Sequence, residues 1–98
     1  SSGRFDVVLE LPMPDAKARL EIFQIHLQKK PLAEDVHLEE LVRSTEGHSG
    51  GDIHFICRKA SALAIRDFLK IGEKGAPCIE KHHFEIALSL LKSNRSLQ

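Results

Sequence analysis

The stretch IHFICRKASALAIRDFL, residues 53–69, predicts a helix with apolar residues on two faces instead of one. At about 100° per residue, one apolar face, called here the core stripe, consists of Ile53, Ile56, Cys57, Ala60, Ala64 and Phe68. The nearly opposite face, called here the second stripe, consists of Phe55, Ala62 and Leu69. A surface helix needs only one apolar face to pack on its own core. The second stripe therefore predicts an interface if it is exposed, unless the last helix of the chain covers it.

The chain has 98 residues, enough for one domain with a single modest core. Apolar residues make up 42% and charged residues 29%, which is typical of a globular domain. Lysine plus arginine equals aspartate plus glutamate at 14 each, so no net charge attracts nucleic acid or a membrane surface. The apolar runs are short and interrupted by charges, which indicates neither a signal peptide nor a membrane span. We expect an intracellular, cytoplasmic domain, with the nucleus as an alternative in a eukaryote.

The segment FDVVLELP, residues 5–12, has the alternating and β-branched character of a short strand that ends at Pro12. No other segment of the chain is a convincing strand. This strand is therefore expected either to have no partner or to belong to a sheet supplied by another part of a longer protein. Residues 1–3, Ser-Ser-Gly, resemble an expression scar and are left out of the fold prediction.

The first predicted helix begins after Pro14 and Asp15, which suit an N-cap, and runs to about Lys29 before Pro31 stops it. One face of this helix is expected to face the core, and it consists of Ala16, Leu20, Phe23 and Leu27. The other side also carries apolar residues together with an imidazole: Ala18, Ile22, Ile25 and His26.

Two further helices complete the predicted fold. HLEELVRST, residues 37–45, predicts a short helix with Leu38, Leu41 and Val42 inward. A last helix is predicted from about Glu80 to Lys92 with Phe84, Ala87, Leu88 and Leu91 inward, followed by a frayed polar end at 93–98. The predicted fold class is all-α, with four helices preceded by one short strand or extended segment.

The segment EGHSGGDI, residues 46–53, predicts a sharp helix start. Ser49 and Asp52 have the spacing of a capping box, in which each side chain accepts a backbone N–H of the other residue. Gly50 and Gly51 then fall in the first helical turn, where glycine costs up to about 1 kcal/mol relative to alanine. Bare backbone at a helix N-terminus lets another group approach closely, but glycine can also simply ease a turn. The local sequence favours neither interpretation.

The cysteines and histidines do not predict a disulfide or a metal site. Cys57 lies on the core stripe, where a reduced thiol acts as a small apolar group, so Cys57 and Cys78 are both expected to be free. Neither His82 with His83 nor His48 with His54 has a recognised ligand spacing. His82 and His83 are also expected to point in different directions on a helix. We therefore expect no metal site.

Several motifs appear in the order seen in AAA ATPases: GRFD at 3–6, LPMPD at 11–15, IFQIH at 22–26, PLAEDVHLEELVRSTEGHSGGDI at 31–53 and HFEIAL at 83–88. The chain resembles the end of the second region of homology of that family followed by its small C-terminal helical subdomain, the lid. The resemblance is closest to the valosin-containing-protein type, with the proteasomal ATPases as relatives. It implies that residues 1–12 end the large ATPase domain and that residues 13–98 form the lid.

The resemblance implies a role in binding ATP or ADP, with Mg²⁺ held elsewhere in a longer protein. The chain has no G-x-x-x-x-G-K-[ST] phosphate loop and no acidic Mg²⁺ motif, so by itself it is expected neither to hydrolyse ATP nor to bind it tightly. The positions of Ile22 and His26 match family residues that meet adenine and ribose. Gly50 and Gly51 match a small pair beside the adenine edge, and Arg4 matches an arginine finger that reaches a neighbouring subunit's γ-phosphate.

The implied function is a lid that clamps nucleotide and couples ATP hydrolysis to protein unfolding or remodelling by a hexamer. Its expected partners are the large ATPase subdomain, neighbouring subunits and, through the whole assembly, protein substrates. LPMPD at 11–15 lies where a hinge is expected. One alternative is a helical module that binds an adaptor or assembly factor. A nucleic-acid-binding domain is a further alternative, which the scattered placement of Arg58, Lys59 and Arg66 does not favour.

Overall fold

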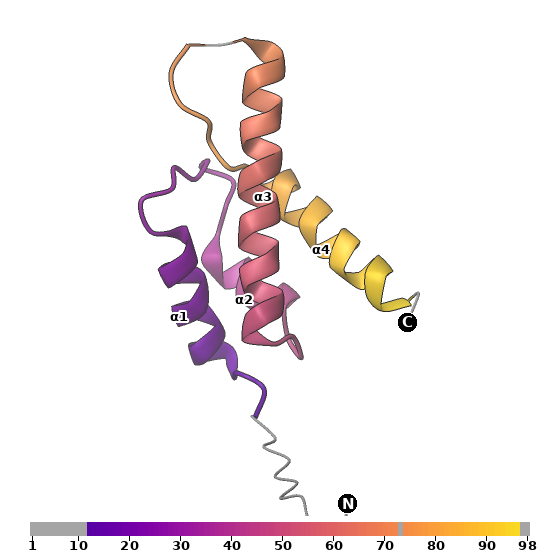
Figure 1. The fold of residues 1–98 in the computed structure, drawn as a ribbon. Coiled ribbons are helices and arrows are strands. Elements are labelled where there is room, and N and C mark those ends of the chain that lie inside the picture. Colours follow the sequence, from indigo (N-terminus) through magenta and orange to yellow (C-terminus); the bar gives the residue numbers. More distant parts are fainter. Residues whose placement is uncertain (1–11, 73, 97–98) are drawn as a thin grey trace, which may run out of the picture.

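The computed structural model describes residues 12–72 and 74–96, with side chains up to residue 94, and this part of the chain is all-α. It contains α1 (Ala16–Leu27), α2 (Leu38–Ser44), α3 (Gly50–Ile71) and α4 (Lys81–Ser96), shown in Figure 1. The four predicted helices are confirmed. The strand predicted at 5–12 lies outside the described residues except for its last residue, and Arg4 lies outside them as well.

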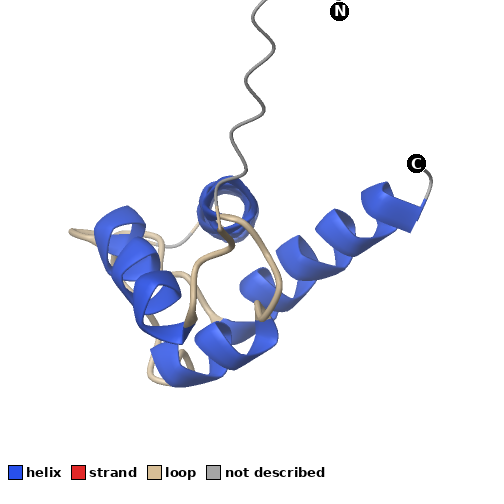
Figure 2. Ribbon diagram, turned by 90° about the horizontal axis from the view of Figure 1, so that it is seen from below, coloured by secondary structure: helices blue, strands red, loops and turns tan. Residues whose placement is uncertain are grey.

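Helix α3 is the centre of the domain. Both α1 and α4 pack against α3, and α2 packs against α1. Figure 2 looks along α3 and shows the other three described helices around one side of it. The C-terminal half of α4 extends away from α1 and α2 (Figure 1). None of the described helices is both long and apolar enough to cross a bilayer.

The ends of α3 follow from local sequence. The Ser49 hydroxyl accepts the backbone N–H of Asp52 at 3.1 Å, and the Asp52 carboxylate accepts the backbone N–H of Ser49 at 3.0 Å, so the predicted capping box is confirmed. At the other end, Gly72 adopts a left-handed conformation with φ 71° and donates its N–H to the Phe68 carbonyl. A side chain is rarely tolerated in that conformation, so glycine is the natural residue to end the helix.

The hydrophobic core contains most of the core stripe. Its buried apolar residues are Phe23, Leu27, Val42, Ile53, Ile56, Cys57, Ala60, Ala64, Ile79, Phe84 and Ala87. Phe68 of the core stripe is half-buried, as are the α4 residues Leu88 and Leu91. The buried α4 residues Phe84 and Ala87 belong to the same core cluster as the core stripe.

The second stripe is exposed. Leu69 is 71% exposed, Phe55 is 36% exposed, and Ala62 is also exposed. Coverage of this stripe by the last helix was one of the two expectations, and it is wrong because α4 packs its apolar face into the core instead. The second stripe is therefore an apolar surface that the described part of the chain leaves exposed.

Helix α1 begins as predicted and buries the predicted face except for its first residue, Ala16. The Asp15 carboxylate accepts the backbone N–H of Ala18 at 2.8 Å and caps the helix, which ends at Leu27, two residues before the predicted Lys29. Phe23 and Leu27 are buried and Leu20 is half-buried, but Ala16 is exposed. The expectation that Ala16 faces the core is wrong because Arg19 takes the inner position in that turn.

Arg19 is 6% exposed and ties α1 to the end of α2. Its Nε and Nη2 donate to the Val42 carbonyl at 3.3 and 3.1 Å, and its Nη1 donates to the Pro14 carbonyl at 2.9 Å. Val42 lies in the last turn of α2, where carbonyls carry partial negative charge, and its carbonyl also accepts the backbone N–H and the hydroxyl of Thr45. A buried guanidinium is therefore stabilised by backbone carbonyls, which the sequence pattern did not predict.

The segment that follows α1 pairs with the segment that precedes α4. Ala33 donates its N–H to the Ile79 carbonyl at 2.8 Å, and Ile79 donates to the Pro31 carbonyl at 3.0 Å, forming a short parallel bridge. This bridge brings the segment after α1 beside the segment before α4. The Asp35 carboxylate also accepts the backbone N–H of Lys81, the first residue of α4, at 3.1 Å.

Helix α4 is longer than predicted. It continues to Ser96 instead of ending near Lys92, so the frayed end expected from residue 93 is wrong up to that point. The physical reason is that no glycine or proline interrupts the helix between these two residues.

Candidate functional site

Two of the four residues expected to contact nucleotide meet between α1 and α3. A Cβ atom built on Gly50 would lie 3.6 Å from Cδ1 of Ile22, which is ordinary van der Waals contact. Ile22 and Gly50 are both half-buried, so this contact lies at the margin of the core. We call the line of contacts between Ile22 and His26 on α1 and Gly50 and His54 on α3 the α1–α3 seam.

One helical turn further along the seam, two histidines stack. The ring centroids of His26 and His54 are 4.3 Å apart and their planes differ by 18°. His26 is half-buried, whereas His54 is exposed. Burial lowers the pKa of His26 below its ordinary value of 6.5, and the nearby charges of His54 and Lys30 lower it further. The neutral imidazole, with one donor and one acceptor nitrogen, is thus the favoured form of His26.

The two glycines of the first α3 turn are not required by packing within the chain. A Cβ on Gly51 would meet only the Ser49 hydroxyl, at 3.8 Å, and the nearest atom to a Cβ on Gly50 is also at ordinary contact distance. Neither residue adopts the left-handed conformation that demands glycine. The described part of the chain therefore has room for a Cβ atom at both positions, and its internal contacts do not explain why glycine stands there.

Gly51 and His54 also line an open hollow of about 440 Å³ along the first three turns of α3, together with Phe55, Arg58 and Lys59. The hollow combines bare backbone, two aromatic rings and two basic side chains. Such a surface can receive a flat, partly apolar ligand that carries negative charge.

The start of α3 is held by a second polar contact in addition to the capping box. Nδ1 of His48 lies 3.3 Å from Oδ2 of Asp52, the same oxygen that accepts the Ser49 N–H. His48 is buried at 8% exposure. This arrangement agrees with the interpretation of Asp52 as a helix-capping residue, and it fixes the backbone on which Gly50 and Gly51 lie.

The expectation that His82 and His83 point in different directions is wrong. Nε2 of His83 lies 2.8 Å and Nε2 of His82 lies 3.7 Å from the same Asp67 oxygen, and the two rings lie 4.1 Å apart between centroids. Asp67 is near the C-terminal end of α3, so these contacts connect it to the first turn of α4. The prediction considered only the spacing of two adjacent histidines on one helix, and this spacing does not indicate that Asp67 of another helix lies beside both of them.

The side chains of Asp67, His82 and His83 could surround a cation, because one ligand atom from each lies within 4.8 Å of the other two. However, Nδ1 of the buried His83 accepts the backbone N–H of Glu80 at 3.0 Å. A neutral ring that accepts at Nδ1 carries its proton on Nε2 and donates it to Asp67. The atom of His83 that would bind a metal is therefore engaged as a donor, and the cluster is suited to joining α3 and α4.

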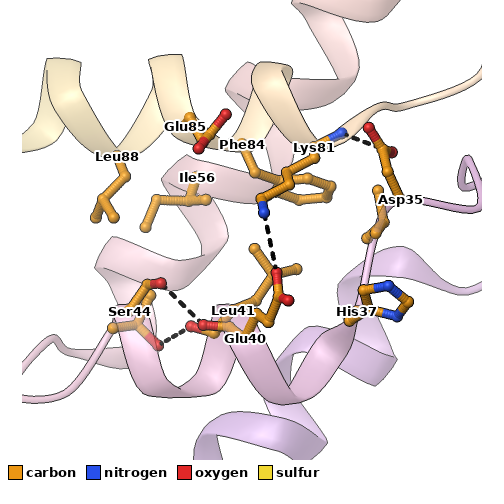
Figure 3. A pocket seen from close by; sticks show the side chains of 12 residues that line it. Asp35, His37, Glu40, Leu41, Ser44, Ile56, Lys81, Phe84, Glu85 and Leu88 are labelled. Carbon is orange, nitrogen blue, oxygen red and sulfur yellow. Dashed lines mark hydrogen bonds and ion pairs between the residues drawn. The ribbon is translucent and has the colours of Figure 1, made fainter.

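A narrower pocket of about 80 Å³ lies between α2 and α4, away from the α1–α3 seam (Figure 3). Its apolar wall includes Leu41, Ile56, Phe84 and Leu88. At its rim, Nζ of Lys81 lies 3.4 Å from the Glu40 carboxylate. The sequence did not predict this pocket, because its lining comes from three helices far apart in the chain.

Both cysteines are free, and they differ in environment. Cys57 is fully buried, which raises the pKa of its thiol to about 12, whereas Cys78 is exposed. Neither residue lines the seam or either of the two pockets described above.

Comparison with known proteins gives one family match. The family described as the AAA+ lid domain matches residues 35–86. The "Cell division cycle protein 48 homolog" of Archaeoglobus fulgidus is 48% identical over 92% of this chain, and a "Proteasome-activating nucleotidase" of Methanoculleus marisnigri is 43% identical over 84%. The "26S proteasome regulatory subunit 4 homolog B" of Arabidopsis thaliana is 52% identical over 74%. The chain spans 13%, 22% and 18% of the lengths of these three relatives.

Proposed function

Because the chain belongs to the AAA+ lid domain family, we propose that it clamps adenine nucleotide in a larger hexameric ATPase. In this proposal Ile22 contacts the adenine, His26 contacts the ribose, and the backbone at Gly50 and Gly51 borders the adenine edge. ATP or ADP with Mg²⁺ is held mainly by the large ATPase domain. The lid contributes a wall of the site, and its movement couples hydrolysis to unfolding or remodelling of protein substrates.

The observation that carries this proposal is the α1–α3 seam. Four residues expected to meet one ligand come from two helices, and the structure places Ile22 against Gly50 and His26 one turn further on. The seam offers apolar contact, an imidazole and uncovered backbone side by side. These are the groups that a flat base and an adjacent sugar hydroxyl require.

A pair of isoleucine variants in the full-length ATPase tests this assignment. Ile22→Ala should weaken ADP binding about fivefold, because roughly 1 kcal/mol of apolar contact with the base is lost. Ile25→Ala is the matched control, since Ile25 lies on the same helix and is 63% exposed. Binding is measured by titration calorimetry on variants whose thermal unfolding shows that they are folded. Equal ADP affinity in both variants would contradict the clamping role.

Arg4 is proposed to act on the γ-phosphate bound to the neighbouring subunit. A guanidinium stabilises the charge that develops on transferring phosphoryl oxygens, and such a group contributes about 10³- to 10⁵-fold in rate. In the full-length ATPase, Arg4→Ala should abolish most hydrolysis while ADP affinity stays within about twofold. Arg43→Ala, at an exposed position of α2, serves as the control. Full hydrolysis by the Arg4 variant would remove Arg4 from the proposal.

The 98-residue chain by itself is proposed to be inactive. It lacks the phosphate loop and the Mg²⁺ motif, so the seam supplies only part of the contacts that hold a nucleotide. We expect no ATP hydrolysis by a clean preparation and no ADP binding at micromolar concentrations. Measurable turnover by the chain would require a different function.

A second candidate function is a docking module for an adaptor or assembly factor. The pocket between α2 and α4 favours it, because an apolar wall is bordered by the acidic Asp35, Glu40 and Glu85 and one lysine, Lys81 (Figure 3). An apolar anchor flanked by basic residues would suit this pocket. Glu85→Lys should then abolish capture of the partner without changing ADP affinity, whereas Ile22→Ala should do the reverse.

A further inference from the structure

The His26–His54 stack continues the seam in a regular way. His26 follows Ile22 by four residues on α1, and His54 follows Gly50 by four residues on α3. Residues four apart lie on the same face of a helix, so the stacked rings lie one turn beyond the Ile22–Gly50 contact. The ring of His54 therefore bears on the residue proposed to meet the ribose.

The stack restrains the His26 ring. A long or flat side chain at a half-buried helix position can adopt several rotamers, and contact with a second, nearly parallel ring removes some of them. The ring centroids lie 4.3 Å apart and the ring planes differ by 18°, so the two rings are stacked in close contact. An imidazole held in one orientation presents its nitrogen to a ligand at a lower entropic cost than a mobile one.

The stack is also sensitive to charge. The charges that act on His26 are His54 from α3 and Lys30 from the segment after α1, and both are positive when protonated. Burial and these two neighbours lower the pKa of His26, so the neutral ring is favoured near neutral pH. Protonation of both rings would place two like charges in contact beside a lysine and push the rings apart.

We propose that His54 is a positioning residue of the nucleotide site, and that its ring holds the neutral His26 imidazole toward the ribose. This role rests on the proposed function of the seam. It adds that nucleotide affinity depends on an aromatic ring at position 54 and weakens as His26 becomes protonated in acid.

The stack itself is tested without nucleotide on the 98-residue chain. The histidine resonances are titrated by NMR in the unsubstituted chain and in His54→Phe. Removal of a positive neighbour should move the titration of His26 to higher pH, because the lowering effect of His54 is lost. His37→Phe, at an exposed histidine before α2, should leave His26 unchanged. A His26 titration that is identical in His54→Phe would show that the two rings do not interact.

The positioning role is tested by ADP affinity of the full-length ATPase at pH 8 and pH 6. His54→Ala should bind ADP about fivefold more weakly than the unsubstituted protein at pH 8, which corresponds to about 1 kcal/mol. His54→Phe should restore affinity to within twofold at pH 8, because it keeps a stacking ring. At pH 6 it should lose at least as much affinity as the unsubstituted protein does, because His26 is protonated at a higher pH once His54 is removed. His37→Ala should behave as the unsubstituted protein.

The outcomes separate this inference from the proposed function. If Ile22→Ala weakens ADP binding but His54→Ala does not, the positioning role is wrong and the clamp remains. If neither substitution changes ADP affinity, the clamp is wrong as well. Equal loss of affinity in His54→Phe and His54→Ala at pH 8 would also overturn the proposal, since stacking would then contribute nothing.

Discussion

Single residues of one type behave differently in this domain because their burial differs. Cys57 and Cys78 carry the same thiol, but burial raises the pKa of Cys57 to about 12 while Cys78 is exposed. Arg19 is a second residue whose behaviour depends on its surroundings. It is charged yet buried, and three hydrogen bonds to backbone carbonyls stabilise it at the end of α2.

The two thiols should differ in reactivity. The thiolate is the reactive form, and burial both disfavours that form and blocks access to Cys57. We expect iodoacetamide at pH 8 to modify Cys78 in the native chain and Cys57 only after unfolding in urea. Mass spectrometry of the two cysteine peptides checks this result, and Cys78→Ser should show no native modification. Comparable labelling of both native cysteines would contradict the buried position of Cys57.

At the scale of elements, local sequence sets where helices begin and tertiary contacts set how they are joined. The capping box and Gly72 define α3 by contacts within a few residues. The contact of α3 with α4 depends instead on Asp67, which lies fifteen residues before His82 and sixteen before His83. The bridge between the segments around Leu32 and Ile79 is likewise formed by residues far apart in sequence.

The capping box should be a measurable part of the stability of α3. Ser49→Ala removes the acceptor of the Asp52 N–H, which typically costs about 1 kcal/mol in the free energy of unfolding. Ser89→Ala, at an exposed position of α4, should cost nothing, because alanine favours helix. Urea unfolding followed by circular dichroism compares the two variants. A loss of the same size in both would show that the capping hydrogen bond is not the cause.

The Asp67 contacts should make the domain less stable in acid. The hydrogen bond from His83 is the main cause that lowers the pKa of Asp67 below its ordinary value of 3.8. Near that pH the unfolded chain therefore binds more protons than the folded chain. The stabilisation is fully present above pH 3.8 and is lost as the pH falls through the lower pKa that Asp67 has in the folded chain. Asp67→Asn should therefore flatten the decline of the urea midpoint between pH 5 and pH 3. Glu46→Gln, at an exposed carboxylate, should keep the decline seen in the unsubstituted chain.

At the scale of the whole molecule, the described part of the domain buries one apolar core and leaves one apolar face of α3 exposed. α1 and α4 pack on α3 and the core stripe is buried, but the second stripe is exposed along the length of α3. Ile65, also on α3, adds to the exposed apolar surface at 45% exposure. Such a surface is typical of a domain that contacts another one, and we propose that the neighbouring large ATPase domain covers it.

Leu69 should matter to assembly more than to folding. It is 71% exposed, so Leu69→Glu should change the free energy of unfolding of the 98-residue chain by less than about 0.5 kcal/mol. In the full-length ATPase the same substitution would bury a charge in the proposed interface and should shift the hexamer toward smaller species. Lys70→Glu, at the adjacent exposed position, is the control for added negative charge. Analytical ultracentrifugation measures both variants, and intact hexamers of Leu69→Glu would exclude this surface from assembly.

The sequence by itself determined the features that depend on neighbouring residues. The four helices, the capping box at Ser49 and Asp52, most of the core stripe and the two apolar faces of α3 follow from periodicity and capping chemistry, which act over a few residues. The family was also recognisable from ordered motifs, although the roles of Ile22, His26, Gly50, Gly51 and Arg4 stay predictions.

Only the tertiary structure decided which distant groups meet. It buried Arg19 where Ala16 was expected, brought His82 and His83 to one carboxylate of Asp67, and stacked His26 on His54. It also left the second stripe uncovered, because the crossing of α4 over α3 fixes which face is buried. These outcomes depend on how helices pack, and sequence spacing within one helix carries no information about the side chains that another helix brings to it.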